Sequence, residues 1–488
     1  MKKLIIPTLI LSLSFISVAC TTDDINLDQH AIYENKPGSL VTYAQKELSD
    51  FLNTPSVNEN NFRLTMQYWQ ETTYVDESNY NFTNRNVSNN IWNDNYVNVL
   101  KNLEQARITI EQYEPNATEI STWPTTKKNQ LAMVDIMKVF TYQVLVDIYG
   151  NIPYSQSVNY DVYPLPKYDD GAGIYMDLIT KLKQDIANID VNGKGFGEAD
   201  IFYFNPDPMV LDSDMPKWMK FANSLLLKLA IGIADSNNSL AQATATEAIA
   251  GGVISSADES CLFRYLAAPP NFNPLFGELK QSGRNDFIAG KTLVDNMLTE
   301  SDGRISKYYQ LNDEGNYVGQ VIGAPGEIGV FSPIGSFAYT STTPGNILTH
   351  TEVAFYLTEA AARWGIGGAP ATLYANAVNA SFNEWGATGA GTYLSAHPYD
   401  PSNWKKSVGE QAWVAMFNQG LQAWNFYRRL DYPVLVAPST AIQNANGKVP
   451  VRLQYPALEA TTNSTNYTAA GVAIGGDRIV TKLFWDKF

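Results

Sequence analysis

The chain has 488 residues, of which 45% are hydrophobic and 17% are charged. This length and composition suit one large globular domain or two ordinary ones, and they exclude a disordered chain. The formal net charge is −15 and no cluster of Lys and Arg occurs, which argues against a nucleic-acid partner and against electrostatic docking on an anionic membrane.

The first twenty residues have the pattern of an export signal that ends at a cysteine. Two lysines precede an apolar run from Leu4 to Ala19, which is shorter than the roughly 20 residues that a membrane-spanning helix needs. Cys20 stands where bacterial lipoproteins carry acyl chains such as palmitate, and an acidic stretch follows it. We therefore expect a signal peptide over residues 1–19, a lipid on Cys20 and an acidic tether over residues 20–30. An ordinary secretory signal with a chance cysteine is the alternative.

Helical periodicity dominates the middle of the chain. Apolar residues recur at helical spacing over residues 134–148, 174–189, 218–229 and 353–364. Gly150 follows Tyr149, just after the first of these segments, and Gly365 follows Trp364 at the end of the last; both positions are typical of a left-handed helix C-cap. Residues 351–364 and 371–385 form an Ala-rich pair with the size of a tetratricopeptide unit. We predict a mainly α-helical repeat scaffold and, because no composition break occurs, a single domain over residues 31–488.

Long segments rich in Gly, Pro, Asn and Ser separate the predicted helices. They cover residues 190–213, 265–288, 312–349 and 386–406. Loops of this length in a compact domain are usually functional or disordered. Because these loops also contain many aromatic residues, we expect them to be ordered and to carry recognition.

Motifs for catalysis and metal binding are absent from the sequence. No G-x-S-x-G or H-E-x-x-H motif occurs, and His30, His350 and His397 lack the spacing of metal ligands. With Cys20 acylated only Cys261 remains, which predicts a small buried hydrophobic side chain and no internal disulfide. We therefore expect no catalytic residue and no cofactor.

The acidic residues leave two alternatives open. The 49 Asp and Glu residues could always supply the carboxylate pair of a glycosidase, although Asp135 and Asp147 are better explained as charges on helix surfaces. The segment Asn-Asp-Glu-Gly over residues 312–315 has only part of the ligand alternation of a calcium loop. The metal ligands therefore stay unknown, and a structural calcium ion stays open.

Segments spread over the chain resemble one protein family. Those in the C-terminal third cover residues 404–413, 415–429, 432–435, 449–456, 475–477 and 484–486. Others cover residues 68–74, 92–96, 147–154 and 349–363. In their order and spacing they closely resemble the SusD/RagB family of nutrient-binding outer-membrane lipoproteins. Trp413, Trp424 and Trp485 belong to this shared pattern, and we expect them in the core.

The resemblance implies a fold and a mode of action. It implies a largely α-helical protein with tetratricopeptide-like units and a loop-rich ligand face, lipid-anchored on the outer surface of the outer membrane. Family members act as a lid on a TonB-dependent channel of the SusC type. They capture oligosaccharides, or in some members peptides, for import.

The chemistry of sugar binding selects candidate residues within this resemblance. Sugars stack on aromatic rings, while amide, hydroxyl and Arg groups bond their hydroxyls. The candidates are Trp69, Arg85, Asn89, Trp92, Tyr96, Phe331, Phe337 and Tyr339. Trp92 comes first because a Trp near this point supports sugar stacking in the starch-binding family member. Packing in the core is the alternative for each aromatic.

The sequence thus predicts a non-catalytic surface lipoprotein that binds a glycan and delivers it to a SusC-like transporter. A peptide-binding member of the same family is the first alternative. A surface glycoside hydrolase and a purely structural repeat adaptor are the others.

Overall fold

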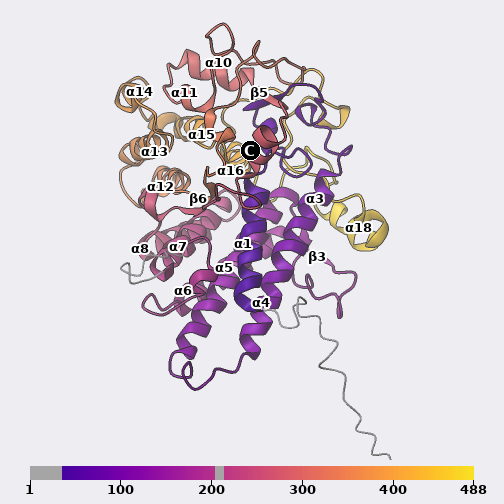
Figure 1. The fold of residues 1–488 in the computed structure, drawn as a ribbon, viewed down its shortest axis with the longest axis vertical. Helices are drawn as coiled ribbons and strands as arrows, with labels where there is room; N and C mark the ends of the chain where they lie inside the picture. Colours follow the sequence, from indigo (N-terminus) through magenta and orange to yellow (C-terminus); the bar gives the residue numbers. More distant parts are fainter. Residues whose placement is uncertain (1–35, 204–213, 488) are drawn as a thin grey trace, which may run out of the picture. The chain divides into compact units, whose positions relative to one another are not determined.

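The computed structural model describes residues 36–203 and 214–487 (Figure 1). Residues from Lys36 onward form one compact unit. The predicted signal peptide, Cys20, the tether and His30 lie outside the described residues.

Helices account for most of the regular structure. In chain order they are α1 (Pro37–Asn53), α2 (Phe62–Thr65), α3 (Val87–Asn93), α4 (Lys101–Gln112), α5 (Trp123–Tyr149), α6 (Gly171–Asn188), α7 (Asp214–Gly232), α8 (Asn238–Gly251), α9 (Pro274–Phe276), α10 (Lys291–Thr299), α11 (Ile305–Tyr308), α12 (His350–Trp364), α13 (Pro370–Glu384), α14 (Ala390–Ala396), α15 (Trp404–Ala415), α16 (Gly420–Leu430), α17 (Glu459–Thr462) and α18 (Ser464–Ala473). A π-helix, η3 (Asp94–Leu100), joins α3 to α4, and a 3₁₀ turn, η7 (Ser336–Tyr339), lies in a long loop.

Strands are short and pair in twos. They are β1 (Trp69–Glu71), β2 (Ile152–Pro153), β3 (Tyr168–Asp169), β4 (Cys261–Phe263), β5 (Phe287–Ala289) and β6 (Gly345–Leu348). The pairs β1–β5, β2–β3 and β4–β6 are all antiparallel. In β1–β5, Trp69 lies opposite Ala289, so this pair joins segments more than two hundred residues apart.

The mainly helical fold confirms the prediction from periodicity. The four predicted segments correspond to α5, α6, α7 and α12, and the predicted partner of α12 is α13. Helix α5 begins well before Val134. Its first turns are polar and mostly outside the core, so the apolar pattern marks only the buried second half of the helix. Gly365 adopts the predicted left-handed conformation at φ 68°, ψ 24°. Gly150 also has positive φ, but its ψ of −112° lies outside the left-handed helical region.

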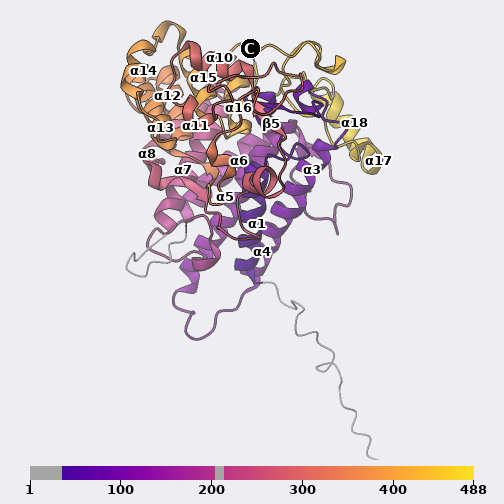
Figure 2. The same ribbon diagram turned by 45° about the horizontal axis from the view of Figure 1, so that its top comes forward.

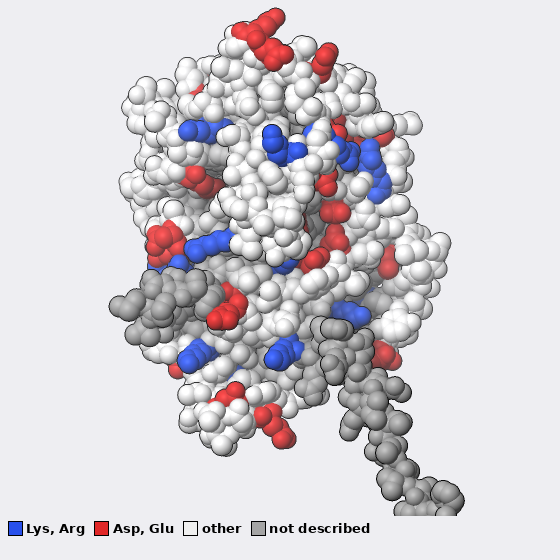
Figure 3. Space-filling view, in the orientation of Figure 1, with Lys and Arg blue, Asp and Glu red and all other residues white. Residues whose placement is uncertain are grey.

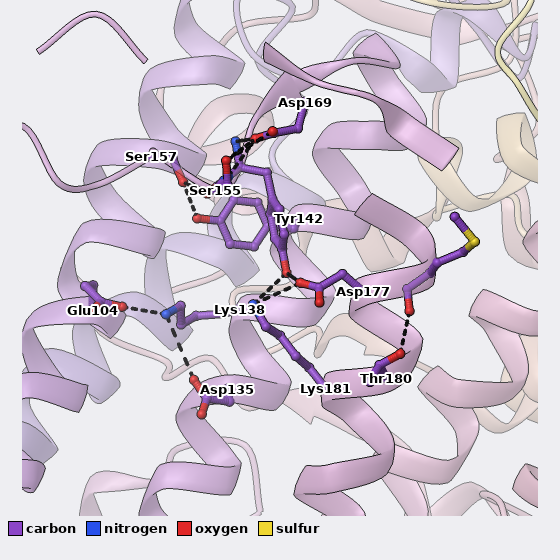
Figure 4. Close-up of polar contacts among 12 residues, drawn as sticks. Glu104, Asp135, Lys138, Tyr142, Ser155, Ser157, Asp169, Asp177, Thr180 and Lys181 are labelled. Atoms are coloured by element: carbon purple, nitrogen blue, oxygen red, sulfur yellow. Dashed lines mark hydrogen bonds and ion pairs between the residues drawn. The ribbon is translucent and has the colours of Figure 1, made fainter. Parts of the chain in front are cut away.

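Consecutive helices pack against one another as in a helical repeat. Helix α5 packs on α6, α7 on α8, and α12 on α13, while α1 packs on α4 (Figures 1 and 2). Polar contacts join neighbouring helices at their half-buried faces. Lys138 of α5 pairs with Glu104 of α4, and both side chains are half-buried (Figure 4). The exposed Lys181 of α6 instead reaches the segment after β2, where it donates to the Tyr154 hydroxyl at 2.8 Å. Within the described residues, no helix is both long and apolar enough to cross a membrane.

The core contains the residues of the shared C-terminal pattern. Trp413, Trp424 and Trp485 are buried, as expected. The Trp424 indole N–H donates to the Pro450 carbonyl at 2.7 Å. Cys261 is free and buried, which confirms the prediction for this thiol.

The prediction that Asp147 is a surface charge was wrong. Asp147 is 4% exposed, because the last turns of α5 are enclosed on all sides and offer no solvent face. Its carboxylate accepts hydrogen bonds from Tyr175 and from Asn425, the latter at 3.0 Å. Burial raises the pKa of Asp147, and the nearby Arg428 opposes that shift. Asp135, half-buried on α5, lies 3.4 Å from Arg107.

Candidate functional site

A cavity of about 870 Å³ opens beside helix α13. Its walls come from α13, the first turn of α12, strands β4 and β6, the turn η7 and residues 255–257. Helices α12 and α13 lie together at the left of Figure 1, with β6 next to α12. We call this cavity the α13 cleft.

A row of asparagines on α13 faces the α13 cleft. Asn376, Asn379 and Asn383 are spaced three and four residues apart, which places them on one face of the helix, and all line the cavity. Within the described chain, none of their side-chain amides makes a hydrogen bond to the protein. Asparagine is a poor residue for a helix interior, so three unpaired amides do not stabilise α13. Their donors and acceptors are left available to a ligand.

Aromatic rings form another part of the cleft wall. Trp385 directly follows α13 and Phe337 belongs to η7; both are half-buried and line the cavity. Their ring centroids lie 5.1 Å apart at 82°, an edge-to-face contact. Trp385 also packs edge-on against the buried Tyr308 at 4.8 Å. The rings are thus held by the core while parts of them reach the cavity.

Two ionisable side chains line the α13 cleft. Glu384 accepts a hydrogen bond from the Thr351 hydroxyl. The Glu384 side chain is exposed at the cavity, but protein atoms around it also partly desolvate its carboxyl group. This desolvation, together with the charge of Glu352, raises the pKa of Glu384 to about 7. Burial lowers the pKa of His350, which therefore stays neutral at neutral pH.

One of the sequence candidates, Phe337, lines the α13 cleft. Trp69 lies in the core, where it is 1% exposed. Phe287 packs on it at 5.2 Å, and the Arg63 guanidinium lies over the ring at 5.1 Å. No ring face of Trp69 is open to a sugar in this structure. Phe331 and Tyr339 are half-buried and do not line the cleft.

Trp92 and Tyr96 lie together in an aromatic cluster that we call the Trp92 cluster. Trp92 is 9% exposed and packs against Tyr96 at 4.8 Å, Tyr149 at 5.1 Å and Tyr168 at 5.9 Å. The Tyr96 hydroxyl donates to the carbonyl of Pro153 at 2.5 Å. These rings are enclosed by other rings, so the first candidate from the sequence is a core residue here.

Arg85 and Asn89 line two further cavities, separate from the α13 cleft. Arg85 lines one of about 140 Å³ and pairs with Glu77 at 2.8 Å. Glu71 also lines that cavity and hydrogen-bonds to Glu77; burial and this contact raise the pKa of Glu71 to about 8. Asn89 lines a cavity of about 170 Å³ together with Tyr455. The sequence candidates therefore do not converge on one site.

Sequence reasoning missed the residues that dominate the α13 cleft. The Asn376, Asn379 and Asn383 spacing was readable as a polar stripe on a predicted helix. A stripe of amides in place of charges is the signal that would have identified a ligand-facing side. Trp385 and Glu384 gave no such signal, because their position depends on how α13 packs against α12.

The segment that the sequence left open as a calcium loop, residues 312–315, forms a turn. The Asn312 Oδ1 atom accepts from the backbone N–H of Glu314 at 3.1 Å and of Asn316 at 2.8 Å. This side chain closes the turn. Among the described residues, no group of three or more His, Cys, Asp or Glu side chains is placed to hold a metal ion.

Comparison with known proteins assigns the chain to a family. Residues 29–456 match the SusD-like family model described as "Starch-binding associating with outer membrane". The chain therefore belongs to the SusD-like family, as the resemblance in sequence indicated. No curated protein matches the chain.

Solved structures share the fold over nearly the whole chain. A chitin-binding protein matches with 26% identity and a TM-score of 0.78, covering 93% of this chain and 100% of its own. A SusD homologue from Bacteroides uniformis has 24% identity, a TM-score of 0.77 and the same coverage. A chitin-binding SusD homologue from Flavobacterium johnsoniae has 21% identity and a TM-score of 0.73, covering 92% of this chain and 97% of its own. The last two show likeness of fold.

Proposed function

We propose that this chain captures a glycan in the α13 cleft without transforming it. The observation that carries the proposal is the row of unpaired amides on α13, beside half-buried aromatic rings in a cavity of about 870 Å³. Ligand sites in proteins are cavities of this size with a few convergent polar groups. Each asparagine amide offers donors and an acceptor, which match the hydroxyls of a sugar.

The geometry of α13 fits a chain of sugar rings. Side chains three and four residues apart on a helix lie about 5–6 Å apart at their Cβ atoms, which is on the scale of one sugar ring. The Asn376–Asn383 face could therefore contact successive positions along an oligosaccharide. Trp385 and Phe337 offer apolar surface for the C–H faces of the same ligand.

Chitin oligosaccharides are the first ligands to test. A similar protein of known structure, with 26% identity, is named as chitin-binding. The acetamido group of N-acetylglucosamine carries one donor and one acceptor, and an asparagine amide can pair with both. On the face of the molecule in Figure 3, acidic and basic side chains are scattered among many uncharged ones.

The carboxyl groups support capture in place of hydrolysis. Glu384 is the one acidic side chain among the described residues that line the α13 cleft. Glycosidases hold their two carboxyl groups about 5–9.5 Å apart, which leaves room for the reacting bond or a water molecule. A reducing-sugar assay on purified protein is expected to detect no product.

Membrane attachment and a transporter partner complete the proposal. The family is described as associating with the outer membrane, and the first residues of the sequence have the pattern of an export signal followed by Cys20. A lipid on Cys20 would hold the protein at the cell surface, where it would pass the glycan to a SusC-like TonB-dependent barrel. Cys20→Ala is expected to release the protein from membranes, and gentle detergent extraction of the wild type is expected to recover a much larger barrel protein in near-equal amount.

Calorimetry with the soluble form lacking residues 1–20 tests glycan capture. Chitin oligosaccharides are expected to bind, and Trp385→Ala is expected to weaken that binding. A panel of other glycans and a set of short peptides completes the experiment. Binding of peptides alone would favour the peptide-binding alternative and overturn the proposal, as would glycan binding that Trp385→Ala leaves unchanged.

A further inference from the structure

Glu384 is a carboxyl group on the wall of the α13 cleft, and no Lys or Arg of the described chain forms an ion pair with it. It lines the cavity, and its hydrogen-bond partner in the described structure is the neutral hydroxyl of Thr351. Among the described residues, no Lys or Arg lowers its pKa, and the charged neighbour that acts on it is Glu352, another acid.

The neighbours of Glu384 cannot supply the missing positive charge. Glu352, behind the wall on α12, already forms a buried ion pair with Lys228 of α7 at 3.0 Å. His350, the other ionisable residue in the lining, has a pKa lowered by burial, so it is neutral near pH 7. The cleft therefore presents a potential negative charge that the protein does not neutralise.

Two buried carboxylates of this molecule are paired with arginine. Glu359 contacts Arg429 at 2.7 Å, and Asp302 contacts Arg304 at 2.6 Å. Those carboxylates hold the fold together and are closed to a ligand. Glu384 differs in both respects, because it is unpaired and it faces open space next to the amides of α13.

We propose that Glu384 selects a sugar with a free amine, so that the cleft prefers a partly deacetylated amino-sugar chain to the fully acetylated one. This inference rests on the proposed function, since it names the ligand class of the same cleft. The ammonium group of a glucosamine unit would lie beside the Glu384 carboxylate. Neighbouring acetylated units would occupy the Asn376–Asn383 row and the Trp385 ring.

The physical reason is the uncompensated charge. A carboxylate without a cationic partner forms a charge-assisted hydrogen bond with an ammonium group, which is stronger than its bond with a neutral hydroxyl. Hydrogen bonds to charged groups contribute more than those between neutral groups, by enough to change affinity about tenfold. A neutral acetamido group would make a weaker bond to the same oxygen atoms.

The experiment compares two oligosaccharides of equal length, one of N-acetylglucosamine only and one with a glucosamine unit in it. Calorimetry at pH 7.0, where a carboxyl group with a pKa of about 7 is half ionised, measures both with the soluble chain lacking residues 1–20, with Glu384→Gln and with Glu114→Gln. Glutamine keeps the shape and the Thr351 contact but removes the charge. Glu114 is an exposed acid just after α4, outside the cleft, so its variant controls for net charge.

The wild type is expected to bind the glucosamine-containing chain more tightly. Glu384→Gln is expected to lower that affinity about tenfold and to change the affinity for the acetylated chain less than about twofold. Glu114→Gln is expected to change neither affinity. Equal affinity of the wild type for both chains, or an equal loss for both in Glu384→Gln, overturns this inference and leaves glycan capture standing. If neither oligosaccharide binds, the proposed capture of chitin-type glycans and this inference are both overturned. An unchanged melting temperature of Glu384→Gln shows that the variant is folded.

Discussion

The Trp92 cluster and the α13 cleft are built from the same kinds of residue and do different things. In the Trp92 cluster, the ring of Trp92 is enclosed by Tyr96, Tyr149 and Tyr168. In the α13 cleft, Trp385 is held from behind by Tyr308 while part of it reaches an open cavity. An aromatic residue near a loop therefore indicates a binding site only if part of its ring is exposed to a cavity.

Polar residues show the same contrast. At the cavity of about 140 Å³, Arg85 is paired with Glu77, and Glu71 hydrogen-bonds to Glu77. In the α13 cleft, the Asn376–Asn383 amides and Glu384 face the cavity without a charged partner among the described residues. Satisfied polar groups stabilise a fold, whereas unsatisfied ones that face open space are free to bind a ligand.

The largest expected effect tests whether the Trp92 cluster is purely structural. Trp92→Ala removes a nearly buried ring and leaves a cavity among tyrosines, so we expect a loss of about 3–5 kcal/mol in unfolding free energy. Urea titration measures that loss, and calorimetry is expected to show unchanged glycan affinity. Loss of glycan binding at a temperature where the variant is still folded would show that Trp92 contacts the ligand.

The comparison also explains what the sequence could predict. Helical periodicity and the order of family segments predicted the fold, because burial of a helix face leaves a regular apolar pattern. Asp147 was placed at the surface because the pattern does not reveal that the end of α5 is enclosed on every side. The site was harder still, since Trp385 and Glu384 reach the cleft only through the packing of α13 on α12 and η7.

The next effect concerns the pH dependence of stability. Glu71 is buried and its pKa is raised to about 8, so the folded protein keeps a proton that the unfolded chain releases near pH 4.5. Its contribution is therefore lost as pH rises through this window, by at most about 1.4 kcal/mol per pH unit. Glu71→Gln keeps the donor to Glu77 without titrating, so its stability relative to wild type is expected to increase from pH 5 to pH 8.

Chemical unfolding at four pH values measures this difference, and Glu384→Gln is the matched comparison in the cleft. Glu384 also has a raised pKa, but it is open to solvent, so its variant is expected to change the pH profile less. Parallel profiles for wild type and Glu71→Gln would contradict the raised pKa of Glu71.

A smaller effect is expected at the cleft wall. Trp385→Ala removes a ring surface from the α13 cleft and is expected to weaken chitin-oligosaccharide binding by about 1 kcal/mol or more. Trp385→Phe is the matched control, because it keeps an aromatic face and removes an indole N–H that is buried without a partner in the described structure. We expect Trp385→Phe to bind nearly as well as wild type. If both variants bind like wild type, the Trp385 ring does not contact the glycan.

The smallest effect separates the amide row from the helix that carries it. Asn379→Ala replaces a poor helix residue by the best one, so the free energy of unfolding is expected to rise by a few tenths of a kcal/mol. The same change removes a donor and an acceptor from the middle of the row, so glycan affinity is expected to fall by about 1 kcal/mol. Gln242→Ala on α8, which removes an exposed amide outside the cleft, is expected to leave affinity unchanged. Stability and affinity would thus move in opposite directions for Asn379→Ala alone. If Asn379→Ala gains stability and keeps full affinity, Asn379 is an ordinary surface residue that does not contact the glycan. The proposal of a continuous row of ligand-binding amides would then be wrong.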